Sequence, residues 1–222
     1  MSDRSAGAAS ISQTIAAHVA GCDYAALPAS AVRAAKMLML DTLAVAWSGT
    51  SAPGAPEARA LLIDEGGRAD STVWGFGGRL PAMSATFINS IAGAALDYDG
   101  VDCVHGAVVA LPAALALAER EHASGKEFLA AYVIGSDLCS RFGGVITGAH
   151  KGWYTTSIYG AFGAAATAAK LLGLNANATC DALGICLSQA AGTQQPNIEQ
   201  SLSKRSEEHT SELQSHHDLV CR

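Results

Sequence analysis

The sequence predicts an all-α fold, a helical bundle, and three observations support this expectation. Half of the 222 residues are hydrophobic but only 6% are aromatic, so small and aliphatic side chains must build the core. Apolar residues recur at helical spacing through most of the chain. The connections between these stretches are short and no internal repeat is found, which favours a bundle over an alternating α/β fold.

Eight helices are expected, and most have a recognisable start or stop signal. In chain order they cover residues 11–21, 30–48, 58–65, 81–99, 108–123, 126–142, 157–172 and 178–191. Ser10 is a good N-cap for the first helix, which Gly21 ends. The run STVWGF, residues 71–76, is the only good strand candidate.

From residue 81 onward the expected helices are longer and more apolar. Pro81 opens the fourth helix, which should run to about Asp99. Pro112, within the fifth, marks either a kink or the true start of that helix. A glycine-rich loop over residues 143–153 separates the sixth helix from the seventh.

The last residues differ in character from everything before them. Residues 206–222 form a polar run without apolar periodicity, and residues 205–216 (RSEEHTSELQSH) resemble the conceptual translation of a common sequencing-library adapter. We therefore expect a helical domain over 1–204 that is incomplete, followed by an artefactual, disordered tail over 205–222. The histidines and the cysteine of this tail are accordingly not interpreted as a metal site.

Composition excludes several classes of partner. The formal net charge is −6, of which residues 206–222 supply −3, and no basic stripe of the kind that binds nucleic acid is present. The longest apolar stretches are interrupted by Gly, Asp or Pro, so no membrane span is expected. The first ten residues do not resemble an export signal, and the five cysteines outside the tail show no CxxC spacing. We expect free thiols in a reducing cytoplasm.

A cluster of acidic residues and a histidine is the first candidate site. Asp97, Asp99, Asp102 and His105 lie within nine residues, where an apolar helix gives way to a loop. A histidine beside a carboxylate is a natural acid–base pair, because the carboxylate fixes the tautomer and raises the basicity of the ring. The same residues could be the solvated end of an ordinary helix. They could also ligate a metal, although neighbouring residues alone do not fix a ligand geometry.

Two further stretches could bind carboxylates. The first places hydroxyl groups before and at a helix N-terminus, a position that suits anions but also simple N-capping. Its candidate residues are Tyr154, Thr156 and Ser157. The second is a polar loop that ends in Lys204 and Arg205, two cations that could pair with a dicarboxylate or end a solvated loop.

These stretches, in their order and spacing, resemble the N-terminal helical domain of the MmgE/PrpD family. That family includes 2-methylcitrate dehydratase, cis-aconitate decarboxylase and iminodisuccinate epimerase. The resemblance runs from about residue 10 to Lys204. Its matching segments are LMLDTLAVAWSG (38–49), FINSIAGAALDYDG (87–100), TSIYGAFGAAATAAKLLGL (156–174) and ALGICLSQAAG followed by SLSKR.

The resemblance implies roles for individual residues. Asp97 matches the family's active-site aspartate and Lys204 matches the lysine of its Lys-Arg/Pro-Leu segment. His105 matches the histidine of its HP-small motif, in which Gly106 here replaces the proline. These three are the expected catalytic residues. The expected substrate contacts are Asp99, Tyr154, Thr156, Ser157 and Arg205.

The implied activity is that of a lyase without metal or organic cofactor, dehydratase-like, acting on a small hydroxylated di- or tricarboxylate. His105 would remove the proton alpha to a carboxylate while Lys204 holds the substrate. A decarboxylase or epimerase of the same family, or a non-catalytic helical interaction module, are the alternatives. Ala94, Gly100 and Tyr154 stand where the family often has His, Asp and His, which favours an uncharacterised lyase or isomerase.

The resemblance also implies that the chain is a fragment. Family members continue past this region into an α/β domain and then return to complete the helical domain, and they are expected to form homodimers. We therefore expect the isolated chain to expose core surface and to be inactive.

Overall fold

The computed structural model describes residues 9–100, 104–145 and 152–194 of the chain. Within these residues the fold is all-α, which confirms the predicted class. Its helices are α1 (Ile11–Gly21), the 3₁₀ turn η1 (Tyr24–Ala26), α2 (Ala29–Gly49), α3 (Ala55–Glu65), α4 (Ala82–Ala94), α5 (Gly106–Arg120), α6 (Gly125–Val145), α7 (Thr155–Leu171) and α8 (Ala176–Leu187). Its strands are β1 (Ser71–Thr72) and β2 (Arg79–Leu80).

The signals at the helix ends account for most of the observed bounds. Ser10 caps α1 as expected, and its hydroxyl accepts from the amide of Gln13 while the Gln13 side chain accepts from the amide of Ser10. Asn175 caps α8 in a similar way. Pro112 lies inside α5, seven residues into a helix that begins at Gly106, so it does not mark the start of that helix.

Two expectations about the elements before the candidate site are wrong. The expected strand over 71–76 is only two residues long, because the chain turns back through left-handed glycines such as Gly75 and Gly77. β1 therefore pairs with β2 in an antiparallel hairpin. The fourth helix ends at Ala94 instead of near Asp99. Asp97 has a φ of 56°, a left-handed conformation that an α-helix cannot include.

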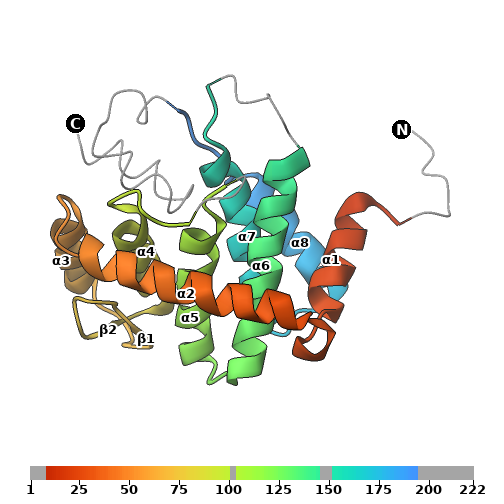
Figure 1. Ribbon diagram of the computed structural model, residues 1–222, viewed down its shortest axis with the longest axis horizontal. Coiled ribbons are helices and arrows are strands. Elements are labelled where there is room, and N and C mark those ends of the chain that lie inside the picture. Colours follow the sequence, from red (N-terminus) through yellow and green to blue (C-terminus); the bar gives the residue numbers. More distant parts are fainter. Residues whose placement is uncertain (1–8, 101–103, 146–151, 195–222) are drawn as a thin grey trace.

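α5, α6 and α7 each pack against the other two, and the long helix α2 crosses one side of this bundle. In Figure 1, α2 lies across α4, α5 and α6, and it contacts all three. α5, α6 and α7 stand side by side behind it, with α1 and α8 against α7 at one edge. α3 and the β-hairpin close the opposite edge, next to α4.

Small residues allow these helices to approach each other closely. A Cβ on Gly49 would stand 1.9 Å from the carbonyl oxygen of Ala92, so α2 and α4 touch along their backbones. At the crossing of α6 and α7, a Cβ on Gly135 would stand 2.7 Å from the carbonyl oxygen of Gly163. The low aromatic content and high Ala and Gly content of the sequence thus correspond to backbone-to-backbone packing.

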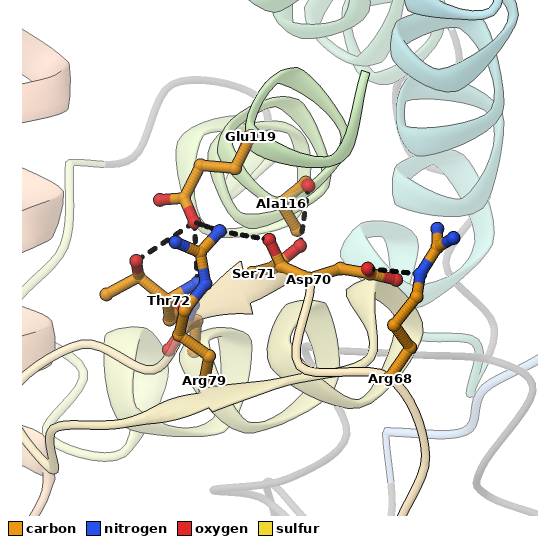
Figure 2. A network of polar contacts seen from close by, with 8 residues as sticks. Arg68, Asp70, Ser71, Thr72, Arg79, Ala116 and Glu119 are labelled. Carbon is orange, nitrogen blue, oxygen red and sulfur yellow. Dashed lines mark hydrogen bonds and ion pairs between the residues drawn. The ribbon is translucent and has the colours of Figure 1, made fainter. Parts of the chain in front are cut away.

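A polar network joins the β-hairpin to α5, as Figure 2 shows. Glu119 accepts hydrogen bonds from the amide and the hydroxyl of Thr72, at 2.7 and 2.9 Å, and an ion pair links it to Arg79. The buried hydroxyl of Ser71 donates to the carbonyl of Ala116 at 2.7 Å. These bonds satisfy hairpin groups that a two-residue strand leaves unpaired, so residues of α5 provide the hydrogen-bond partners that a neighbouring strand would provide in a larger sheet.

Two expectations from composition can be examined in the described residues. Cys22, Cys139, Cys180 and Cys186 form no disulfide bond there. None of the described helices has the length and apolar character needed to cross a bilayer.

Candidate active site

The candidate acid–base site begins where α4 ends. The last turns of α4 are buried, from Ile88 to Ala94, and this fixes where the chain leaves the core. The amide of Asp97 donates to the carbonyl of Ala94 at 2.9 Å, which closes a turn. After this turn the exposed Asp97 and the buried Asp99 follow, and the latter is only 6% exposed.

Asp99 and His105 form the central contact of the site. The Nδ1 atom of His105 lies 2.9 Å from the Oδ2 atom of Asp99. The Asp99 side chain is fully buried, whereas 18% of the His105 side chain is exposed. A carboxylate on Nδ1 places the proton of the neutral ring there, and Nε2 is then the basic nitrogen. The pair expected from the sequence is therefore present, and Asp99 is the carboxylate that orients the histidine.

α5 and α7 meet at this contact. His105 is the N-cap residue of α5, and its amide donates to the hydroxyl of Thr156, in the first turn of α7, at 3.2 Å. Thr156 and Ser157 are both buried. Tyr154, the N-cap residue of α7, is buried as well, and its amide donates to the carbonyl of Gly192. The structure thus brings Thr156 against His105 and sets Ser157 and Tyr154 beside it in sequence.

Some of the expected site residues lie outside the described part of the chain. These are Asp102, Lys204 and Arg205. The roles expected for Lys204 and Arg205 in holding a carboxylate stay predictions. The structure therefore brings together one end of the expected site, which consists of the acid–base groups and the start of α7.

A residue far away in the sequence also contacts this loop. The amide of Gly100 donates to the Oδ2 atom of Asp41, which lies in the middle of α2, at 3.3 Å. Sequence reasoning does not identify this partner, because 59 residues separate the two positions. The available signal is a charged, weakly helix-forming residue within an otherwise apolar helical stretch.

Two neighbouring groups on α6 are unsuited to proton transfer near neutral pH. Cys139 packs against Gly106, directly after the histidine, and burial raises the pKa of its thiol to about 12. Burial also raises the pKa of Tyr132 to about 12. Both groups stay protonated at neutral pH, so among the described groups of this site His105 and the carboxylates are the ones suited to acid–base chemistry.

The same cluster has the composition of a cation site. One ligand atom each from Asp97, Asp99 and His105 lies within 4.8 Å of the others. Two carboxylate oxygens and an imidazole nitrogen could hold a divalent ion. The bond between Asp99 and Nδ1 of His105 also orients an imidazole for proton transfer without an ion.

An apolar groove begins beside these residues. It has a volume of about 600 Å³ and runs between α3, α4, α5, α7 and α8. Thr156 and Ser157 line one part of it, whereas Asp97, Asp99 and His105 do not line it. The groove is therefore a neighbour of the acid–base pair and does not contain it.

Comparison with known proteins agrees with this description. Residues 13–213 match the MmgE/PrpD N-terminal domain. The cis-aconitate decarboxylase-like protein oryM of Aspergillus oryzae is 32% identical over 179 residues, which cover 75% of this chain and 37% of that protein. The matched range ends at residue 213, and the domain boundary expected at 204 stays a prediction.

Two further relatives are cis-aconitate decarboxylases. That of Aspergillus terreus is 33% identical over 177 residues, 75% of this chain and 36% of the relative. The human protein is 30% identical over 191 residues, 82% of this chain and 40% of the relative. The chain thus spans less than half the length of the curated relatives that it matches.

Proposed function

Because the chain belongs to the MmgE/PrpD family, we propose that it supplies the acid–base pair of a lyase that acts on a small di- or tricarboxylate. The observation that carries this proposal is the 2.9 Å contact between Asp99 and the Nδ1 atom of His105. The chain spans less than half the length of its relatives, so the proposal concerns the complete product of its gene.

His105 is the proton-transfer group in this proposal. Its Nδ1 is bonded to a fully buried carboxylate, so its Nε2 can accept a proton as the imidazolium becomes stabilised by Asp99. Asp97 offers a second carboxylate within 4.8 Å of the pair, measured between single ligand atoms, and it is exposed enough to reach a bound molecule. General acid–base catalysis of this kind contributes about 10²–10⁴-fold to a rate.

The substrate's carboxylates would lie near the N-termini of α5 and α7. Neither N-cap residue, His105 or Tyr154, bonds to its own helix through its side chain. The N-terminus of a helix carries about half a positive charge, which favours anions. Lys204 and Arg205, the two cations expected from the sequence, would supply full positive charges to the substrate's carboxylates.

Decarboxylation is the first candidate reaction, because the named relatives are cis-aconitate decarboxylases or resemble one. Loss of CO₂ breaks a carbon–carbon bond and leaves its electron pair on the substrate, and protonated His105 would then deliver the proton to carbon. Dehydration is the second candidate, since the same His105, unprotonated, could remove a proton alpha to a carboxylate as hydroxide leaves. Both reactions need one histidine that is held by a carboxylate.

A substrate panel on the complete gene product tests this proposal. cis-Aconitate and 2-methylcitrate would be offered separately, with released CO₂ and the ultraviolet absorbance of a new conjugated double bond as the two readouts. His105→Asn should lower turnover by about 10²–10⁴-fold. His122→Asn is the matched control, because His122 is exposed and its φ of 54° suits asparagine.

The outcomes separate the possibilities. CO₂ release that depends on His105 supports decarboxylation, and double-bond formation without CO₂ supports dehydration. Equal turnover by His105→Asn and His122→Asn would remove the acid–base assignment. No turnover of any carboxylate by the folded complete protein would instead favour a non-catalytic helical module.

A further inference from the structure

We propose that Asp41 is a positioning residue for the Asp99–His105 pair, acting through the backbone of Gly100. This inference rests on the proposed function, because it assigns to Asp41 the role of keeping Asp99 in contact with His105. Within the described residues of the loop, the Oδ2 atom of Asp41 accepts a 3.3 Å hydrogen bond from the amide of Gly100.

The segment that carries the carboxylates is fixed at both of its ends. At the first end, the amide of Asp97 donates to the carbonyl of Ala94, at the terminus of α4. At the other end, the amide that follows Asp99 directly is the one bonded to Asp41. Between these two bonds lie only a few residues, so the position of the Asp99 carboxylate follows from the positions of α4 and α2.

This segment needs such restraint, because its conformation is costly. The Asp99 side chain is fully buried, and its Oδ1 atom has no hydrogen-bond partner in the part of the chain that is described. A buried carboxylate oxygen without a partner is strongly disfavoured relative to one in water. Asp97 adds a left-handed backbone with a φ of 56°. Without a fixed end, rotation of the segment toward solvent would relieve both costs and withdraw Asp99 from His105.

Close packing under Gly100 supports the same interpretation. A Cβ at Gly100 would stand 3.1 Å from the Cδ2 atom of Leu38 and 3.7 Å from the Oδ2 atom of Asp41. The loop therefore rests directly on one turn of α2, with Leu38 as an apolar contact and Asp41 as a polar one. Asp41 itself is exposed and lies in the middle of a 21-residue helix, where aspartate is an unfavourable choice. Its position is explained by the bond to the loop and not by helix stability.

The test uses three aspartate variants of the complete gene product. Asp41→Ala removes the acceptor, and Asp41→Asn keeps an acceptor oxygen of the same reach but removes the charge. Asp137→Ala is the matched control, because Asp137 is another helical aspartate, on α6, whose partner is Arg141 in an exposed ion pair.

We expect Asp41→Ala to lower kcat by about 10–100-fold with little change in KM, since a misplacement of about 1 Å in a catalytic group can cost 10²-fold. Asp41→Asn should retain most of the activity, and Asp137→Ala should retain all of it. The Nδ1 proton of His105 should be observed by NMR at low field because of its bond to Asp99. Of the three aspartate variants, only Asp41→Ala should lose or broaden this signal. The unfolding midpoint of Asp41→Ala should stay close to that of the parent protein, because alanine favours the helix.

Several results would overturn this inference. Parent-like kcat and an unchanged Nδ1 proton in Asp41→Ala would show that the bond does not position the pair. A kcat in Asp41→Asn as low as in Asp41→Ala would show that the charge acts and not the acceptor. These outcomes are distinct from failure of the proposed function, which would appear as full activity in His105→Asn.

Discussion

The crossing of α6 and α7 gives the sharpest test of the packing described above. Gly135 lies in α6, and a Cβ added there would stand 1.9 Å from the hydroxyl oxygen of Thr167 and 2.7 Å from the carbonyl oxygen of Gly163. Real Cβ atoms do not approach other atoms this closely, so Gly135→Ala must push the two helices apart or rotate Thr167. Thr167 is fully buried and has little room to rotate.

The expected change combines three contributions. Forcing extra volume into a packed core costs about 1–3 kcal/mol. Displacing Thr167 also weakens the 3.3 Å bond that its hydroxyl donates to the carbonyl of Ala131, a bond worth about 1 kcal/mol. Alanine in place of glycine returns about 1 kcal/mol of helix propensity. We therefore expect Gly135→Ala to lower the free energy of unfolding by roughly 1–3 kcal/mol.

Chemical denaturation with urea, followed by circular dichroism, measures this change. The matched control is Gly184→Ala, in the interior of α8, where a Cβ would meet nothing within 4 Å. This control should raise the free energy of unfolding by up to about 1 kcal/mol. If Gly135→Ala were as stable as Gly184→Ala, the close approach of α6 and α7 would not exist in solution.

Two further predictions concern buried polar groups. Asn89→Ala should lower the free energy of unfolding by about 2–4 kcal/mol in urea denaturation. The amide of Trp74 and the carbonyl of Thr72 are both bonded to Asn89 at 2.9 Å, and the substitution leaves them without these partners. A loss smaller than that of an exposed Asn→Ala change would contradict this prediction. Stability should fall as the pH rises above about 9, because Cys139 and Tyr132 keep their protons to about pH 12 when folded but lose them earlier in the unfolded chain. The free energy of unfolding should drop by about 1.4 kcal/mol per pH unit for each of these groups that is ionised only in the unfolded chain. Cys139→Ala should flatten this alkaline decline, and an unchanged slope between pH 9 and 10.5 would refute the assignment to the thiol.

The sequence predicts the positions of most helices well, but it does not predict the end of α4 or the length of the strand over 71–76. Helical periodicity and caps such as Ser10 locate the elements, because both signals act within one or two turns. The end of α4 is missed because residues 95–99 continue a helix-compatible pattern, and only the backbone shows that Asp97 is left-handed. The strand over 71–76 is overextended because its length depends on pairing with β2 and on Glu119, far along the chain.

In the candidate site, too, contacts between residues close in the sequence can be predicted, whereas contacts between distant residues cannot. The sequence indicates a histidine–carboxylate pair because the acidic residues and His105 lie within nine residues, but only the structure shows that the carboxylate in contact is that of Asp99, a residue expected to contact the substrate. Thr156 is proposed as a site residue from its place at a helix start, but its contact with His105 joins positions 51 residues apart. The bond between Asp41 and Gly100 spans 59 residues and depends on how α2 crosses α4. Such crossings are set by glycines and alanines, which carry little signal about their partners.

The relative direction of α5 and α7 explains why the acid–base pair lies where it does. His105 contacts Thr156, and four residues further along each helix Val109 packs against Gly160, so the two helices run parallel. Parallel helices bring both N-termini to the same end of the bundle, and each N-terminus carries about half a positive charge. An antiparallel pair would place a negative C-terminus beside Asp97 and Asp99. The parallel arrangement instead places two positive helix ends at the end of the bundle where Asp99 and His105 are in contact.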